Sequence, residues 1–127
     1  MILKKMLAGL IVGSLLAVLV TACSIKEASP VVIPTVHMGA LGFIQDSITF
    51  HKGEMLALVD DSISPHQIEN GSWVNGVARP AIDPGAPSVN QVFNGYDSAE
   101  VGPFNIAGTF HFYCAIHQTM NLTVIVT

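Results

Sequence analysis

Three residues with metal-binding side chains follow one another at intervals of three near the end of the printed sequence: Cys114, His117 and Met120. They come directly after residues 108–113, an aromatic and β-branched run that is typical of a strand. A second histidine, His66, lies far upstream and precedes another segment that is typical of a strand start. Two imidazoles, one thiolate and a weak axial thioether are the ligand set of a blue-copper electron-transfer centre. The order and spacing therefore predict a metal centre.

Each of these residues has a more common explanation when it is taken alone. A single inward cysteine is usually a small core residue, a methionine often fills a core, and a histidine after a proline, such as His66 after Pro65, often caps a loop. Cys-x-x-His at a strand end, a methionine three residues later and one distant histidine together make a complete ligand set. The joint pattern therefore favours a metal centre over unrelated core and loop residues.

The donor atoms favour copper. Thiolate and thioether sulfur suit copper better than calcium, magnesium or manganese, and zinc usually takes four strong ligands where only three are available. A catalytic metal needs an open coordination position, which an axial Met120 would close. Ser62 and Ser64 lie near His66 in the sequence but are expected to hydrogen bond locally in a turn. The sequence predicts one Cu(I)/Cu(II) ion and no enzymatic activity.

Short segments rich in β-branched and aromatic residues must position these ligands, since no window has a sustained helical period. The predicted strands are residues 31–37, 47–51, 55–59, 67–69, 109–113 and 121–127. Turn sequences such as Asn75-Gly76 separate them, a pattern that favours an antiparallel sandwich or barrel. Residues 71–94, with Trp73 and three prolines, are predicted to form a long irregular connection.

Alternation along the strands decides which side chains meet. The two phenylalanines of residues 109–113 share a face with Cys114 and are expected in the core, so Cys114 points inward and His111 outward. By the same argument Met120 and His66 lie on apolar faces. The ligands are therefore expected to converge at one interior end of the sandwich.

The start of the chain resembles an export signal. Two lysines precede a nearly continuous apolar run, which ends in small residues before Cys23, as in a bacterial lipobox whose cysteine becomes lipid-modified. An uncleaved membrane anchor is the alternative, although the run is shorter than the roughly 20 residues that a bilayer requires. We expect a signal peptide at residues 1–22, a lipid-anchored tether at 23–34 and the folded domain at 35–127.

The two cysteines of an exported protein would ordinarily suggest a disulfide. Lipid attachment at Cys23 would instead leave Cys114 without a partner, and metal binding gives that thiol a reason to be present. Without the first 22 residues, three basic residues face nine acidic ones. This balance argues against a nucleic-acid partner and permits a basic protein partner.

These residues resemble those of the cupredoxins, the plastocyanin and amicyanin family of small blue copper proteins. The resemblance covers most of the predicted domain and is strongest in residues 61–66 and 108–117; the Cys-x-x-His-x-x-Met spacing is similar to the short ligand loop of amicyanin. It implies an all-β, Greek-key antiparallel β-sandwich. It also implies His66 and His117 as equatorial imidazoles, Cys114 as the thiolate and Met120 as the axial ligand.

Two features depart from the family pattern. Gln67 stands where the family commonly has an asparagine, whose side chain helps to tie the two ligand loops together. Residues 71–94 also lack an obvious counterpart in the family.

The resemblance implies a type 1 (blue) copper electron-transfer protein. Together with the lipobox at Cys23, it leads us to expect a protein lipid-anchored outside the cytoplasmic membrane or on its periplasmic side. Its expected partners are redox proteins such as c-type cytochromes or an oxidase, which it would bind transiently. The protein itself is expected to be a monomer. His117 would be the electron port, within an apolar patch that includes Ala115, Ile116, Pro65 and Met38. The alternatives are a copper-buffering or copper-delivery protein on the same fold, and an adhesion-like β-sandwich with incidental Cys and His residues.

Overall fold

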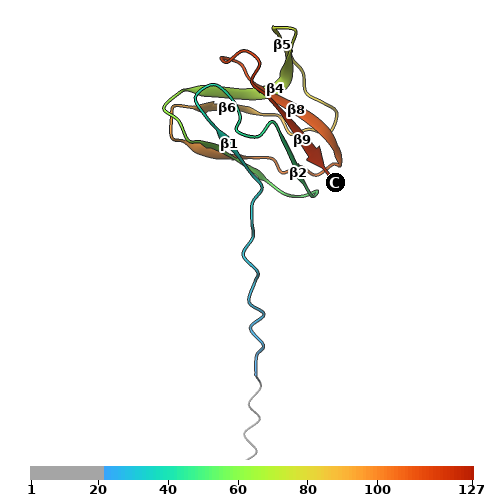
Figure 1. The fold of residues 1–127 in the computed structure, drawn as a ribbon. Coiled ribbons are helices and arrows are strands. Elements are labelled where there is room, and N and C mark those ends of the chain that lie inside the picture. The colour runs from blue at the N-terminus through green and yellow to red at the C-terminus, as the bar shows by residue number, and fades with distance from the viewer. Residues whose placement is uncertain (1–21) are drawn as a thin grey trace, which may run out of the picture. The chain divides into compact units, whose positions relative to one another are not determined.

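The computed structural model describes residues 22–127, and Val31–Thr127 form one compact unit (Figure 1). The strands are β1 (Thr35–Met38), β2 (Ser47–Phe50), β3 (Leu56–Asp60), β4 (His66–Val74), β5 (Val77–Pro80), β6 (Asn90–Phe93), β7 (Ser98–Val101), β8 (Gly108–Cys114) and β9 (Asn121–Val126). Almost all of the predicted signal peptide lies outside the described residues. Within residues 22–127 no helix is long and apolar enough to cross a membrane.

The strands form two sheets, which confirms the all-β sandwich. The smaller sheet has the order β1-β3-β7, and the larger has the order β2-β9-β8-β4-β5, with β6 also paired to β4. β1 is parallel to β3 and β2 is parallel to β9, so the sheets are mixed and not wholly antiparallel as expected. The reason is that the chain crosses from one sheet to the other between β1 and β2. Turn sequences mark where strands end but do not say which strands pair.

Alternate side chains of the strands build the core between the sheets. Burial follows a period of two along β3 and most of β9, as expected for strands with one face turned inward. Phe104 packs edge-on against Phe50 and Phe112, with ring centroids 5.1 and 5.9 Å apart. This aromatic cluster packs against β8, the strand that ends at the candidate ligand Cys114.

The prediction of an irregular connection over residues 71–94 was wrong. β4 runs to Val74, turns at Asn75-Gly76 and returns as β5, and β6 pairs with the first half of β4. Asn75 and Gly76 have φ angles of 50° and 75°, as a two-residue type I′ turn requires. An Asn-Gly pair between Val74 and Val77 is a strong hairpin signal, so the turn was predicted correctly and its flanking strands were missed.

Candidate metal centre

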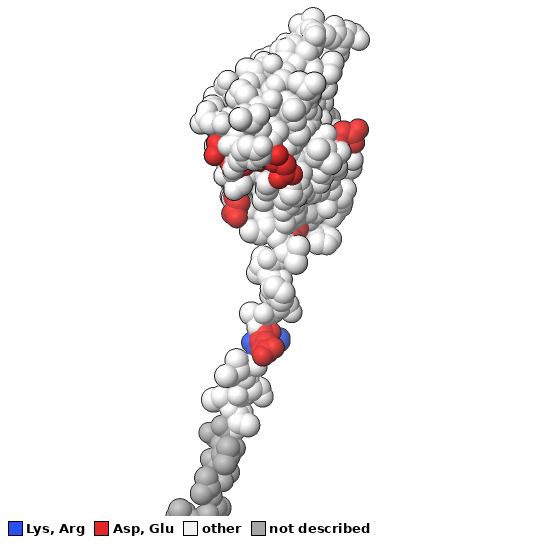
Figure 2. Space-filling view, turned by 60° about the vertical axis from the view of Figure 1, so that its left-hand side comes forward, with Lys and Arg blue, Asp and Glu red and all other residues white. Residues whose placement is uncertain are grey.

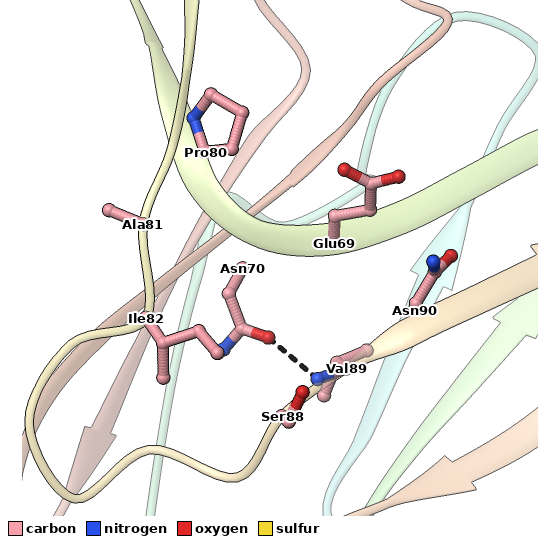
Figure 3. A pocket seen from close by; sticks show the side chains of 8 residues that line it. All are labelled: Glu69, Asn70, Pro80, Ala81, Ile82, Ser88, Val89 and Asn90. Atoms are coloured by element: carbon pink, nitrogen blue, oxygen red, sulfur yellow. Dashed lines mark hydrogen bonds between the residues drawn. The ribbon is translucent and has the colours of Figure 1, made fainter.

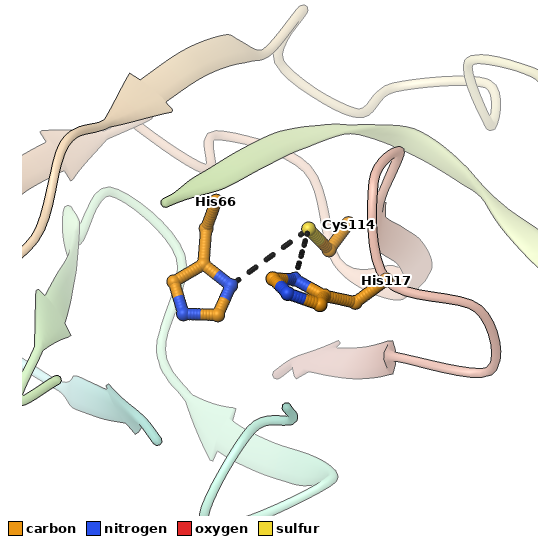
Figure 4. Close-up of side chains that lie close together, drawn as sticks. All are labelled: His66, Cys114 and His117. Atoms are coloured by element: carbon orange, nitrogen blue, oxygen red, sulfur yellow. Dashed lines mark hydrogen bonds between the residues drawn. The ribbon is translucent and has the colours of Figure 1, made fainter. Parts of the chain in front are cut away.

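His66, Cys114 and His117 come together where β4 begins and β8 ends (Figure 4). One ligand atom from each residue lies within 4.8 Å of the other two. Both histidines turn Nδ1 toward the Cys114 sulfur, at 3.8 Å for His66 and 3.4 Å for His117. The two imidazole centroids are 4.8 Å apart. The structure thus brings three of the four predicted ligands together with their donor atoms converging.

Strand register explains how residues 48 positions apart meet. β4 and β8 are antiparallel, and Ile68 lies opposite Cys114. His66 precedes Ile68 by two residues and therefore shares its face of the sheet. His66 and Cys114 are both fully buried, whereas His111 is exposed, as the alternation predicted.

Main-chain contacts connect the two ligand segments. The Ala115 amide donates a hydrogen bond to the Gln67 carbonyl at 2.8 Å, and the Gln67 amide points at the Cys114 sulfur at 3.5 Å. The Gln67 side chain turns elsewhere: its Nε2 donates to Glu69 Oε1 at 2.7 Å and to Asn90 Oδ1 at 3.3 Å. Gln67 therefore joins the ligand segments through its main chain and not through its carboxamide.

Met120 is buried, with 3% of its surface exposed, at the last position before β9. Its amide donates to the His117 carbonyl at 3.3 Å, and its carbonyl accepts from the Cys114 amide at 3.0 Å. The segment from Cys114 to Met120 is therefore a closed turn that returns the chain to β9.

Asp60 is a member of this region that the sequence analysis missed. Its Oδ1 accepts hydrogen bonds from the Ser62 amide and hydroxyl at 3.0 and 2.9 Å, and the residue is only 2% exposed. Oδ1 lies 3.7 Å from His66 Nε2. Among the described residues, Asp60 Oδ2 and His66 Nε2 are the buried side-chain nitrogen and oxygen atoms without a hydrogen bond. Alternation with Leu56 and Leu58 in β3 was the signal that could have placed Asp60 inside.

The surroundings of His66 favour its neutral form. Burial lowers the pKa of His66 below its ordinary value of 6.5; the Asp60 carboxylate opposes this shift, His117 adds to it, and the Gly39 carbonyl opposes it. A neutral imidazole is the form that binds a metal ion. The site is therefore prepared to offer the Nδ1 lone pair of His66.

The loop that carries His117, residues 114–121, is uncharged. His117 is half-buried, Pro65 is exposed, and Ile116 is 52% exposed, whereas Met38 is fully buried and cannot contribute to the expected surface patch. Residues 71–78 and 114–121 contain no Asp, Glu, Lys or Arg. Figure 2 shows acidic side chains across the body of the domain and none at the end that carries β5.

A separate hollow of about 380 Å³ lies beside β4 (Figure 3). It is lined by Glu69, Asn70, Pro80, Ala81, Ile82, Ser88, Val89 and Asn90. The Asn70 carboxamide donates to the Pro87 carbonyl at 2.9 Å and accepts from the Val89 amide at 2.6 Å. Asn70 thus holds the connection between β5 and β6 against β4, and the hollow shares no lining residue with the metal-ligand group.

Neither cysteine is in a disulfide among the described residues. Cys23 is exposed and Cys114 is buried. The exposed histidines His37 and His111 pair with Asp61 and Asp83 at 2.7 and 3.0 Å and take no part in the His-Cys-His group.

Comparison with solved structures identifies the fold. Amicyanin from Paracoccus versutus superposes with a TM-score of 0.59 at 20% identity, over 78% of this chain and 85% of that one. A novel purple cupredoxin from Nitrosopumilus maritimus gives 0.56 at 20% identity, over 74% and 99% of the two chains. The fold is that of a cupredoxin.

A further match to this cupredoxin fold is an amicyanin variant described as Cu(I), with a TM-score of 0.56 at 17% identity over 75% of this chain and 82% of that one. No family model matches the sequence, and no curated protein is significantly similar to it. At these identities the likeness establishes the cupredoxin fold. The chemistry of this chain is argued from its own residues.

Proposed function

We propose that this protein is a type 1 copper electron-transfer protein. One copper ion would be held by His66, Cys114 and His117, with Met120 as a weak axial ligand. The observation that carries the proposal is the convergence of two Nδ1 atoms on one buried sulfur in a cupredoxin fold. A soft thiolate with two imidazoles suits copper, so the donor set fits the ion.

The residues of the site would keep the donors in one arrangement in both oxidation states. Bound copper would supply one-electron chemistry by alternating between Cu(I) and Cu(II). His66 and Cys114 are fully buried, which excludes water, and the Gln67 amide is directed at the Cys114 sulfur at 3.5 Å. His117 is the least buried of the three and offers the route to a partner. A site closed by Met120 has no open position for a substrate, so we propose a carrier and not an enzyme.

The cellular setting is part of the same proposal. A lipobox ending at Cys23, which is exposed, supports a signal peptide at residues 1–22 and a lipid anchor outside the cytoplasmic membrane. Residues 23–34 would tether the domain of residues 35–127. The uncharged loop around His117, with the exposed Ile116, supports transient contact of a monomer with redox proteins such as c-type cytochromes or an oxidase.

The test is copper addition to residues 23–127 carrying Cys23→Ser. We expect one equivalent of Cu(II) to produce an intense thiolate-to-copper absorption band and a reversible one-electron couple. The His66→Gln variant should lose both, whereas His37→Gln, which changes an exposed histidine outside the group, should keep both. Copper uptake followed by ready loss of Cu(I) to a competing protein, with no stable couple, would indicate copper buffering or delivery instead. Failure to bind copper would refute both functions.

A further inference from the structure

We propose that the β4–β5 hairpin, residues 71–80, is a brace that fixes the ligand loop, residues 114–121, with Trp73 as its main positioning residue. The inference concerns the loop of the proposed copper site and rests on that function for its consequence. The brace itself is a property of the chain without metal.

The hairpin contacts the ligand loop at its beginning, middle and end. The Trp73 indole Nε1 donates to the Cys114 carbonyl at 2.9 Å, and Gln118 Nε2 donates to the Gly76 carbonyl at 3.1 Å. Asn121 Oδ1 accepts from the Trp73 amide at 2.7 Å, and Asn121 Nδ2 donates to the Trp73 carbonyl at 3.1 Å. Four hydrogen bonds therefore tie the loop to one hairpin.

These side-chain contacts take over where the sheet ends. β4 pairs with β8 only from Ile68 to Asn70, opposite Cys114 to Phe112. Beyond Asn70, β4 pairs with β5, and the hairpin lies beside the ligand loop at one end of the domain (Figure 1). Beyond Cys114 one bond between main-chain groups joins β4 to the loop, from the Ala115 amide to the Gln67 carbonyl. The polar groups of the hairpin supply the further ties to residues 114–121.

The Trp73 indole is itself held in place. It packs edge-on against Tyr113, with ring centroids 6.0 Å apart and an interplanar angle of 86°. Tyr113 is 2% exposed, and its hydroxyl donates to Glu69 at 3.3 Å. An indole has a single N–H donor, so a fixed ring directs that donor at one acceptor, here the carbonyl of the proposed thiolate ligand.

The loop has a conformation that needs external support. Thr119 has a φ of 68°, a left-handed conformation that is unfavourable for a β-branched residue. Such a conformation persists only where surrounding contacts over-determine it. The Gln67 carboxamide bonds to Glu69 and Asn90, so it gives the loop no support. The hairpin contacts supply the side-chain ties that the loop needs.

The decisive variant is Trp73→Phe, which keeps an aromatic ring against Tyr113 and removes the N–H donor. In the metal-free protein we expect faster hydrogen exchange at the Cys114 and Met120 amides, which bond within the loop, and no change at Thr123, whose amide bonds to Asp46. In the copper-loaded protein we expect about 10-fold faster copper loss to a chelator. The absorption band and reduction potential should shift as well.

Matched variants isolate the brace. Val77→Ala changes an exposed hairpin side chain that makes none of these bonds and should behave as the unmodified protein. Gln118→Ala removes only the bond to Gly76 from an exposed side chain, so it should fold normally and show a smaller increase in exchange at Met120.

Unchanged loop exchange in both Trp73→Phe and Gln118→Ala would overturn the brace. If these variants show faster loop exchange but the unmodified protein binds no copper, the result supports the brace and contradicts the proposed function. The two failures are therefore distinguishable.

Discussion

The two segments that supply the proposed ligands are held in different ways. His66 is the first residue of β4, which is paired with β6 on one side and β8 on the other. Its ring is fully buried, and its nearest charged neighbour is the equally enclosed Asp60. Sheet register and burial therefore fix this donor.

Cys114 is the last residue of β8, and residues 115–120 then leave the sheet in a turn that carries the other donors. Their position depends on hydrogen bonds to the Gln67 main chain and to the β4–β5 hairpin. We therefore expect the position and pKa of His66 (the His66 side of the site) to change with burial and nearby charge. The position of the ligand loop (the loop side) should instead change when individual hydrogen bonds are lost. The following variants test that difference.

The largest effect is expected where both segments meet, at the Cys114 sulfur. Cys114→Ala should abolish the thiolate-to-copper band and most of the copper-dependent rise in thermal stability, since an ion that binds the native state stabilises it by an amount that increases with the affinity. Absorption spectroscopy and thermal unfolding with and without copper measure both. Cys23→Ser is the control and should change neither. A fully coloured Cys114→Ala variant would remove Cys114 from the ligand set.

Gly71→Ala should disrupt the pairing of β4 with β5 at the base of the hairpin. Gly71 has a φ of 129°, and an added Cβ would lie 2.3 Å from the Arg79 carbonyl oxygen and 2.9 Å from the Ala81 nitrogen. Strain of this kind is expected to lower the free energy of unfolding by at least about 2 kcal/mol. Denaturant unfolding measures this value, and exchange should increase more at the Met120 amide than at the Ala115 amide, which bonds to Gln67.

Gly42→Ala is the matched control for this substitution, because its Cβ would meet no atom within 4 Å and its φ is ordinary. Its stability should remain within about 0.5 kcal/mol of the unmodified protein. Equal stabilities for the two alanine variants would show that β4 tolerates a side chain at Gly71.

The ligand group could be predicted from the sequence because its signals are local. Spacing gave His117 and Met120 relative to Cys114, and period-two alternation correctly placed Cys114 inside and His111 outside. Neither depends on knowing which strands pair.

The supporting contacts could not be predicted in the same way, because they depend on pairings between distant residues. Trp73 meets Cys114 across 41 positions, and Asn121 meets Trp73 across 48. Nothing local distinguishes the Trp73 indole from an ordinary core side chain. The Asn75-Gly76 turn and the inward position of Asp60 could be predicted from the sequence. Their importance for the site depends on which strands pair, which the sequence does not show.

Asp60→Asn tests the His66 side with little change in shape. If copper is bound as proposed, the Asp60 carboxylate beside His66 would favour the more positive Cu(II) state. Its neutralisation should then raise the reduction potential and weaken Cu(II) binding about 10-fold. Exchange at the Cys114 and Met120 amides should stay unchanged, because Asp60 makes no bond to the loop. Asp61→Asn is the control: its carboxylate is 55% exposed and pairs with His37, so solvent and salt screen its charge. Equal potentials in the two variants would contradict a role for Asp60.

The smallest effect is expected in the metal-free protein, where the free energy of unfolding should depend on pH through His66 and not through the ligand loop. Burial lowers the pKa of His66 in the folded chain. Just below pH 6.5 the unfolded chain therefore binds more protons at His66 than the folded chain does. The free energy of unfolding should therefore fall as the pH drops below 6.5, by at most about 1.4 kcal/mol per pH unit. Denaturant unfolding of the metal-free protein measures it.

Two variants assign this pH dependence. His66→Gln should flatten the slope, while His111→Gln, which removes an exposed histidine, should retain it. Asp60→Asn should steepen the slope, because the Asp60 carboxylate opposes the lowering of the His66 pKa. Trp73→Phe should leave the slope unchanged, since the hairpin acts on the loop. An altered slope in Trp73→Phe would show that the two sides of the site are coupled even without metal.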